Sequence, residues 1–439
     1  MTVARRTFLA GVTAVSAAKA ASAFARPRKG PPKSVFLWGA ATAAHQIEGN
    51  NVNSDYWVLE HIPDTYFKEP SGDACDSFAR WREDLALVRL GGLNCYRFSV
   101  EWARIEPEAG EFSQATLDHY RRICIACREY GIEPVVTFHH FTSPRWIAAL
   151  GGWENPVVAD HFARYCTVVA KHLGDVIGWA CTMNEPNAQV TSYVIANGKK
   201  WAKQPAILAQ AAQMVGSTRF GAYFLGDAFK VRDTCLDAHA KGREAIKAIA
   251  PHMKVGLTLA LQELAPAPGG EALYRRVYEN ARAPFYAVAA KDEFIGVQTY
   301  NKALIGPDGY LPPAVSVMRD MWDRDASPGA LPAVVREAHR ASGAPVLVSE
   351  NGLNSTDDRQ RIRHLRASVE GLADAIAEGV PVLGYIHWSL LDNFEWGSGY
   401  VPRFGLVEVD RSTFRRMPKP SLTAYRVLVG EMRRRHRWA

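Results

Sequence analysis

The chain has 439 residues, of which 48% are apolar and 22% charged, a composition typical of a globular protein with a large core. Its formal net charge of +7 does not indicate nucleic-acid binding, because the basic residues gather in the leader and at the C-terminus, with no basic run interleaved with aromatics elsewhere. Seven cysteines, an odd number, fit no disulfide framework, and we interpret those in apolar runs as core residues.

Residues 1–25 have the features of an export signal. Arg5 and Arg6 precede a weakly apolar, alanine-rich segment with small-residue cleavage sites at residues 21–25. The pattern resembles a twin-arginine signal, in which the arginine pair is an address read by a receptor; a frayed basic tail is the alternative. The apolar part is too short for a membrane span. We therefore expect an exported protein, periplasmic or extracellular, without a stable membrane anchor, and one domain over residues 26–439.

Short apolar runs of β type alternate with helical patterns along the rest of the chain. The runs lie at residues 35–39, 95–100, 134–140, 177–184, 254–261, 295–301, 345–350 and 382–388, and helical periodicity is clear at 117–130, 156–173 and 359–378. Nearly continuous apolar runs are typical of parallel strands covered on both faces. This alternation predicts the α/β class and a single (β/α)8 TIM barrel. A doubly wound sheet competes, but no Gly-x-Gly-x-x-Gly motif follows any run.

Polar residues accumulate where these runs end. They are His45, Gln46 and Glu48 after the first run, Arg97 in the second, His139 and His140, Asn184 and Glu185, Tyr300 and Asn301, Glu350, and lastly Trp388 with Glu395 and Trp396. The C-terminal ends of parallel barrel strands meet at one rim, where such enzymes carry their sites. We therefore expect an active site at the C-terminal rim of the barrel.

Glu185 and Glu350 each end a run that is otherwise apolar. An unpaired charge is costly there, so each glutamate has either a catalytic role or a structural partner, for which Arg97 is a candidate. Two carboxyls at one rim suit glycoside hydrolysis, in which one is protonated and the other ionised. A carboxylate beside Arg97 and Tyr300 is expected to stay ionised, whereas one beside neutral Asn184 keeps its proton. This predicts Glu350 as nucleophile and Glu185 as general acid and then base, about 5 Å apart.

Tryptophans near the last run support a carbohydrate ligand. Trp388 and Trp396 flank Glu395, and flat aromatic faces pack on the C–H surface of pyranose rings while carboxylates and amides bind the hydroxyls. Core packing is the simpler interpretation of Trp81 and Trp179. It fits Trp396 poorly, because that residue lies in a glycine-rich loop.

His139 and His140 do not predict a metal site. Consecutive strand residues point to opposite faces, so the two imidazoles do not reach one centre. By alternation with Val136 and Phe138, we place His140 inside the barrel and His139 toward the helices. No other His or Cys spacing suggests zinc, and we predict neither a metal nor another cofactor.

The chain resembles the family 1 glycoside hydrolases, retaining β-glucosidase-like (β/α)8 enzymes, over roughly residues 35–430. The resemblance rests on ordered motifs: Phe-Leu-Trp-Gly-Ala-Ala-Thr-Ala-Ala-His-Gln-Ile-Glu-Gly at 36–49, Tyr-Arg-Phe-Ser-Val-Glu-Trp-Ala-Arg-Ile at 96–105, Thr-Met-Asn-Glu-Pro at 182–186, Ser-Glu-Asn-Gly at 349–352, Asp-Asn-Phe-Glu-Trp at 392–396 and Arg-Phe-Gly-Leu-Val at 403–407. It implies a small-molecule β-glycoside as substrate, most simply a β-glucoside.

The resemblance also implies individual roles. Glu185 matches the acid/base and Glu350 the nucleophile, while Arg97 and Tyr300 match the pair that positions the nucleophile. The residues matching those that bind the sugar are Gln46, His140, Asn184, Trp388, Glu395 and Trp396. A transglycosylase on the same scaffold and a non-catalytic carbohydrate-binding protein are the alternatives.

The chain departs from the family pattern mainly on the side of the leaving group. Phe141 replaces a usual Trp, Gln298-Thr299-Tyr300 replaces Asn-Tyr-Tyr, and the stretch 187–218 lacks the customary Pro-Gly turn. Glu395-Trp396 is the pattern of enzymes for unphosphorylated sugars, and the intact Glu185 argues against a thioglucosidase. The natural aglycone, the preference among glucose, galactose, fucose and xylose, and the oligomeric state stay open.

Overall fold

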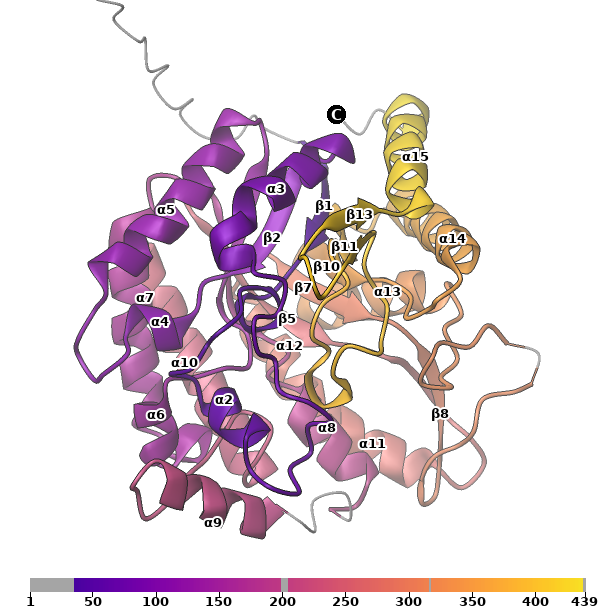
Figure 1. The fold of residues 1–439 in the computed structure, drawn as a ribbon. Helices are drawn as coiled ribbons and strands as arrows, with labels where there is room; N and C mark the ends of the chain where they lie inside the picture. Colours follow the sequence, from indigo (N-terminus) through magenta and orange to yellow (C-terminus); the bar gives the residue numbers. More distant parts are fainter. Residues whose placement is uncertain (1–34, 199–203, 316, 437–439) are drawn as a thin grey trace, which may run out of the picture.

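The computed structural model describes residues 35–198, 204–315 and 317–436, so the leader expected at residues 1–25 lies outside the described part. Within it, eight parallel strands close into a barrel in the order β1-β11-β10-β7-β5-β4-β3-β2, which confirms the predicted fold (Figure 1). The barrel strands are β1 (Leu37–Ala41), β2 (Cys95–Ser99), β3 (Glu133–His139), β4 (Trp179–Asn184), β5 (Lys254–Ala260), β7 (Ile295–Thr299), β10 (Val346–Asn351) and β11 (Val382–Trp388).

Helices follow the barrel strands in the chain and surround the barrel (Figure 1). They are α3 (Ser77–Leu90), α5 (Gln114–Glu129), α7 (Val158–Leu173), α10 (Ala228–Ile249), α11 (Glu271–Ala281), α12 (Ala283–Ala289), α13 (Ala330–Ser342), α14 (Asp358–Ala377) and α15 (Pro420–His436). Three of them begin at a side-chain cap, where Ser113, Asp227 and Asp357 accept hydrogen bonds from backbone N–H groups of the first turn. Such caps satisfy donors that have no partner inside the helix.

The boundaries of the predicted strands and helices agree with the structure to within three residues. The first strand is shifted by two residues at both ends, because it runs from Leu37 to Ala41 rather than over 35–39. Its register explains the shift: Leu37 pairs with Gly384 and Ala41 with Trp388, so β1 ends level with β11 at the rim.

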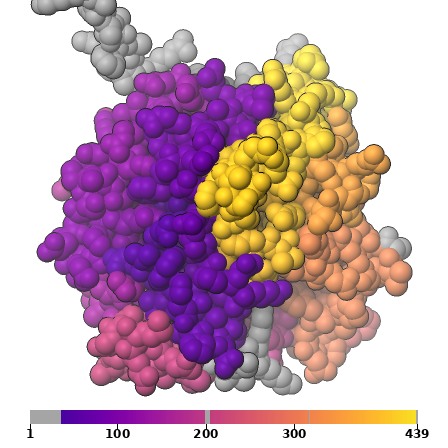
Figure 2. Space-filling model, viewed as in Figure 1, coloured from indigo at the N-terminus to yellow at the C-terminus, as the bar shows by residue number. Residues whose placement is uncertain are grey.

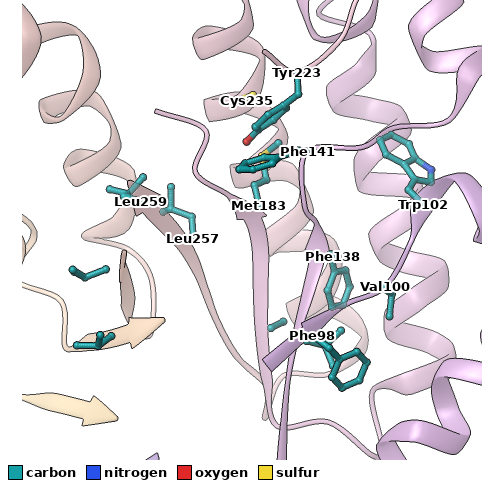
Figure 3. Close-up of a cluster of buried hydrophobic side chains, with 14 of the residues drawn as sticks. Phe98, Val100, Trp102, Phe138, Phe141, Met183, Tyr223, Cys235, Leu257 and Leu259 are labelled. Atoms are coloured by element: carbon teal, nitrogen blue, oxygen red, sulfur yellow. The ribbon is translucent and has the colours of Figure 1, made fainter. Parts of the chain in front are cut away.

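Apolar side chains form two layers, one inside the barrel and one between the barrel and the helices. The interior layer contains Leu37, Ala41, Cys95, Val135, Trp179, Cys181, Leu347 and Ile386, all buried. Figure 3 shows part of the outer layer, with Phe98, Val100 and Phe138 in one group and Phe141, Met183 and Tyr223 in another. All seven cysteines are buried and free, which agrees with their interpretation as core residues.

Loops at the C-terminal ends of the strands carry the shorter elements. These are α1 (Ala44–Ile47), α2 (Asp55–Glu60), α4 (Trp102–Ile105), α6 (Arg145–Ala149), η1 (Gly152–Glu154), α8 (Ala188–Ile195), α9 (Gln204–Met214), β6 (Glu263–Pro266), β8 (Lys302–Gly306), β9 (Gly309–Tyr310), η3 (Trp396–Ser398), β12 (Val407–Val409) and β13 (Arg416–Pro418). In the divergent stretch 187–218, α8 and α9 are helical, and residues 199–203 lie outside the described part.

The segment after β11 lies against the first barrel strand and its loop. Leu390 N–H donates to the Ala41 carbonyl at 3.0 Å, and Phe394 N–H donates to the Gln46 carbonyl at 3.2 Å. Figure 2 shows the first and last parts of the described chain, indigo and yellow, in contact on one face. In the described ranges, no helix has the length and apolar character needed to cross a membrane.

Candidate active site

A cavity of about 250 Å³ lies at the C-terminal ends of the barrel strands. Nine of the ten residues that the sequence assigns to the site line it: Gln46, His140, Asn184, Glu185, Tyr300, Glu350, Trp388, Glu395 and Trp396. The tenth, Arg97 on β2, is fully buried and reaches the cavity through its contacts with Glu350 and Asn184. The fold therefore brings together all ten residues, which are dispersed over 350 positions of sequence (396 minus 46).

Glu350 lies on β10 and receives three donors. Arg97 Nη1 contacts Oε1 at 2.6 Å, Gln298 Nε2 contacts the same oxygen at 2.8 Å, and the Tyr300 hydroxyl donates to Oε2. Burial raises the pKa of Glu350, while Arg97 and Tyr300 oppose that shift. The expected contacts with Arg97 and Tyr300 are present, but they do not bring the pKa down to its usual value, because the carboxyl is removed from water.

Glu185 directly follows β4, and its backbone N–H donates to the Thr258 carbonyl at 2.8 Å. Burial raises the pKa of Glu185 to about 8, and repulsion by Glu350 contributes to this shift. Asn184 was expected beside this carboxyl, but its Oδ1 instead accepts from Arg97 at 2.6 Å and Gln298 at 2.7 Å. Burial and the second carboxyl, rather than a neutral amide neighbour, therefore keep Glu185 protonated at neutral pH.

Three residues lining the cavity have a left-handed backbone although none is glycine. Their φ angles are 73° at Phe141, 50° at Glu185 and 52° at Trp396. Such conformations cost free energy and are retained where the surrounding structure requires them, often at functional sites. Each of the three lies directly after a strand or in a loop and contributes to the lining of the cavity.

The opposite side of the cavity offers aromatic faces and unpaired polar atoms. The His140 ring lies nearly parallel to Trp388 and Trp396, with centroids 5.9 and 6.0 Å apart. Gln46 Nε2 donates to Asn393 Oδ1 at 3.0 Å and to the Phe394 carbonyl at 2.8 Å, which leaves Gln46 Oε1 buried without a partner in the described structure. A buried acceptor without a partner is available for a ligand hydroxyl.

Glu395 completes this side of the cavity. Its Oε1 accepts from Trp388 Nε1 at 3.3 Å. Burial raises its pKa well above the usual value, although the Trp388 hydrogen bond opposes the shift. Burial thus favours the protonated form, which has one O–H donor and remaining acceptor capacity, and hydrogen bonds with ligand hydroxyls would replace the water that the carboxyl has lost.

His140 faces the cavity and His139 packs toward the helices, as expected, but the alternation used to place them is wrong. Val135 packs inside the barrel and Thr137 Oγ1 accepts from Arg97, while Phe138 belongs to the outer layer. Phe138 and the following His139 both point outward, so regular alternation is interrupted before His140. Among the described residues, no group of three or more His, Cys, Asp or Glu side chains could hold a metal ion.

Several further polar residues that line the cavity were not assigned from the sequence, and Gln298 and Arg324 matter most among them. Gln298, which contacts both Glu350 and Asn184, lies on β7, so strand alternation could have indicated it. Arg324 lines the cavity from an irregular loop, where no periodic pattern signals the direction of a side chain.

A (β/α)8 barrel with two buried carboxyls and aromatic walls in one rim cavity has the architecture of a glycoside hydrolase of the paired-carboxylate type. Comparison with known proteins gives the particular family. The sequence profile of glycosyl hydrolase family 1 matches residues 30–284 and 312–433, and the chain belongs to this family.

Characterised relatives cover nearly the whole chain. Beta-glucosidase A of Thermotoga maritima is 31% identical over 443 residues, covering 88% of this chain and 95% of its own. The crystal structure of beta-glycosidase BGL167 is 48% identical, with a TM-score of 0.85 and coverage of 91% and 96%. The apo structure of beta-glucosidase 1317 is 41% identical, with a TM-score of 0.86 and coverage of 90% and 98%.

Proposed function

We propose that the protein is a retaining β-glycosidase, and specifically a β-glucosidase that hydrolyses terminal non-reducing β-D-glucosyl residues. The observation that carries the proposal is the electrostatic difference between the two carboxyls. Glu350 accepts three hydrogen bonds, one of them from Arg97, whereas burial and Glu350 raise the pKa of Glu185 to about 8. At neutral pH one group is ready to attack and the other to donate a proton. Two of the relatives are named as beta-glucosidases, which supports glucose as the sugar.

In the first step, the Glu350 carboxylate attacks the anomeric carbon, and Glu185 transfers its proton to the glycosidic oxygen. The bond between carbon and aglycone oxygen breaks, the aglycone leaves as an alcohol, and a glycosyl ester of Glu350 forms. Arg97 and Tyr300, which hold the two oxygens of Glu350, fix the attacking group in one orientation.

In the second step, Glu185 is the base. It removes a proton from water, the water oxygen attacks the anomeric carbon, and Glu350 leaves as a carboxylate. Formation of the ester has neutralised Glu350 and so removed the negative charge that helped to raise the pKa of Glu185, and Glu185 is therefore more acidic in the intermediate. The same residue can therefore donate a proton in one step and accept it in the next.

The polar groups and the aromatic face in the rest of the cavity match the hydroxyls and the ring of one glucose residue. The unpaired Gln46 Oε1 and the buried Glu395 carboxyl offer acceptors for adjacent hydroxyls. Trp388 offers a flat apolar face for the ring. Asn184 and His140, linked by a 3.2 Å hydrogen bond, present further polar groups to the cavity, and Trp396 lines it with them.

The test is hydrolysis of 4-nitrophenyl β-D-glucoside followed by ¹H NMR of the first sugar released. The proposal requires release of nitrophenol and initial formation of the β anomer. Initial formation of the α anomer would contradict retention. Binding without release would favour a carbohydrate-binding protein, and transfer to added sugars in place of water would favour a transglycosylase. Parallel assays with galactoside, fucoside and xyloside test the glucose preference.

We also propose that the protein is exported through the twin-arginine route, on the basis of Arg5 and Arg6 before an alanine-rich segment. The full-length chain with both arginines replaced by lysine is expected to remain in the cytoplasm, whereas the unchanged chain reaches the periplasm or the medium. Equal export of the two forms in fractionated cells would overturn this proposal.

A further inference from the structure

The leaving-group side of the cavity contains a cation that the catalytic steps do not use. The loop between β9 and α13 forms the wall there, and Trp322 and Arg324 both line the cavity. Arg324 is the only arginine or lysine among the described residues that line it. The inference below concerns the aglycone and rests on the proposed function.

The loop that carries Arg324 is held in one conformation by its own hydrogen bonds. The buried Asp320 carboxylate accepts from the backbone N–H groups of Trp322 at 2.9 Å and Arg324 at 3.0 Å. Met321 N–H donates to the Asn354 carbonyl at 3.0 Å, which ties the loop to the segment after β10. A charged group on such a loop is preorganised for a ligand.

Contacts with Asp320 and Trp322 orient the Arg324 guanidinium, but they do not occupy all of its hydrogen-bond donors. Its Nε donates to Asp320 Oδ2 at 2.7 Å, and Nη2 lies 2.6 Å from the same oxygen. The guanidinium carbon lies 4.4 Å from the centre of the Trp322 ring. Its Nη1 has no hydrogen-bond partner among the described residues, and the side chain is 30% exposed. One edge of the group therefore holds the loop, and a donor on the other edge is available.

An aromatic wall connects this guanidinium with the nucleophile. The Trp322 ring lies 5.4 Å from Phe404, and Phe404 lies 5.5 Å from Tyr300, which donates to Glu350. Arg324 and Trp322 line the same cavity as the proton donor Glu185 and the sugar-site residue Glu395. An aglycone that leaves the sugar within this cavity can therefore contact both Trp322 and Arg324.

Asp320 is the acidic residue that pairs with Arg324 in the described structure, and it occupies one edge of the guanidinium. Glu350, which lines the cavity, is paired with Arg97 at 2.6 Å. Burial raises the pKa of Glu185 to about 8 and also raises the pKa of Glu395 well above its usual value, which favours the protonated form of both carboxyls. A negatively charged aglycone therefore meets a donor without a facing unpaired carboxylate.

We propose that Arg324 is a specificity-determining residue that selects β-glucosides whose aromatic aglycone carries an anionic group, a carboxylate in the simplest case. The aglycone ring packs along Trp322 and its carboxylate accepts a charge-assisted hydrogen bond from Arg324 Nη1.

The experiment compares two substrate pairs, the 3- and 4-carboxyphenyl β-D-glucosides and their methyl esters. For each pair, the ratio of kcat/KM for acid to ester is measured in the wild type, in Arg324→Gln and in Arg319→Gln. Arg319 is the matched control, because it lies in the same loop, pairs with Asp323 at 2.5 Å and does not line the cavity. Intrinsic leaving-group differences cancel, because each ratio is compared between variants.

In Arg324→Gln the ratio is expected to fall about tenfold for at least one pair, the size of a partly exposed charge-assisted hydrogen bond. In Arg319→Gln it is expected to stay at the wild-type value. The wild-type ratio should also fall as NaCl rises from 20 to 500 mM, because salt screens the contact.

An unchanged ratio in Arg324→Gln, or an equal fall in Arg319→Gln, would overturn the inference. If the methyl esters are hydrolysed but the acid-to-ester ratio does not fall in Arg324→Gln, the proposed β-glucosidase activity stands and the role of Arg324 is rejected. If no aryl β-glucoside is hydrolysed by the wild type, the proposed function itself fails.

Discussion

Arg97 Nη1 lies 2.6 Å from Glu350 Oε1, and the two side chains are only 1% and 5% exposed. Burying such a pair costs desolvation energy that the ionic attraction returns only in part, so stability alone does not explain it. The same guanidinium donates to Asn184 Oδ1 at 2.6 Å. One buried cation thus fixes the nucleophile relative to a residue at the end of β4, the strand that Glu185 follows.

Replacement of Glu350 by alanine should remove the nucleophile and leave the general acid in place. We expect kcat on 4-nitrophenyl β-D-glucoside to fall by at least about 10⁴-fold, on the scale found when an enzymatic nucleophile is deleted. Sodium azide should restore part of the turnover by attacking from the vacated side, and the product should be the α-glucosyl azide. NMR identifies that anomer. Wild-type turnover by this variant, or a β-azide product, would contradict the assignment.

The loss of activity on replacement of Glu185 by alanine should depend on the leaving group of the substrate. General acid assistance contributes about 10²–10⁴-fold, and an aglycone of low pKa leaves without it. We expect a large fall in kcat/KM for methyl β-glucoside and a much smaller one for 2,4-dinitrophenyl β-glucoside. In the latter case the second step becomes limiting, and azide should then yield the β-glucosyl azide. Equal losses on both substrates would count against Glu185 as the acid.

The pH dependence of kcat/KM should be bell-shaped. Productive binding needs Glu350 ionised and Glu185 protonated, so activity rises as Glu350 loses its proton and falls as Glu185 loses its own. Because burial and Glu350 raise the pKa of Glu185 to about 8, the alkaline limb should have its midpoint near pH 8. The acid limb should lie above the usual glutamate range, because burial also raises the pKa of Glu350.

The Glu350→Gln variant tests the cause of that alkaline limb. It removes the negative charge that repels ionised Glu185, so the pKa of Glu185 should fall. ¹³C NMR titration of selectively labelled glutamate measures this shift, and Glu263, which lies outside the cavity, gives a reference signal. An unchanged Glu185 titration would show that the two carboxyls do not interact.

The barrel fold and the set of residues that form the site at its rim could both be predicted from the sequence, because both depend on repeated patterns. Apolar runs define the strands, and polar residues at successive strand ends meet wherever parallel strands close. The direction of one side chain is harder to predict, as His140 shows: local alternation breaks after Phe138, and no residue type signals the break. The pKa of Glu350 was likewise not predictable from its partners alone, since Arg97 and Tyr300 favour ionisation and burial outweighs them.

Residues of the irregular loops are the part that sequence reasoning misses. Arg324 follows no strand and belongs to no amphipathic pattern, and its place in the cavity wall depends on hydrogen bonds from Asp320 to backbone groups. Gln298 differs, because it lies on β7 and could have been placed by alternation along that strand. The contrast separates positions set by periodic structure from those set by tertiary contacts.

Gln298 should act as a positioning residue for the nucleophile. Its Nε2 donates to Glu350 Oε1 at 2.8 Å and Asn184 Oδ1 at 2.7 Å, so Gln298→Leu removes a donor that favours the ionised carboxyl. We expect kcat to fall about ten- to a hundredfold and the acid limb of the pH profile to move to higher pH. Gln298→Asn should restore part of both, if the shorter amide still reaches either acceptor.

The matched control for this prediction is Gln189→Leu. Gln189 is also a buried glutamine, but it donates to the Gly226 carbonyl at 3.2 Å and contacts neither catalytic carboxyl in the described structure. Both leucine variants lose one buried side-chain hydrogen-bonding group, so their melting temperatures should fall to a similar extent. Only Gln298→Leu should shift the acid limb, because only Gln298 contacts Glu350. A loss of activity without that shift, or a similar shift in Gln189→Leu, would show that Gln298 contributes to stability and not to the ionisation of the nucleophile.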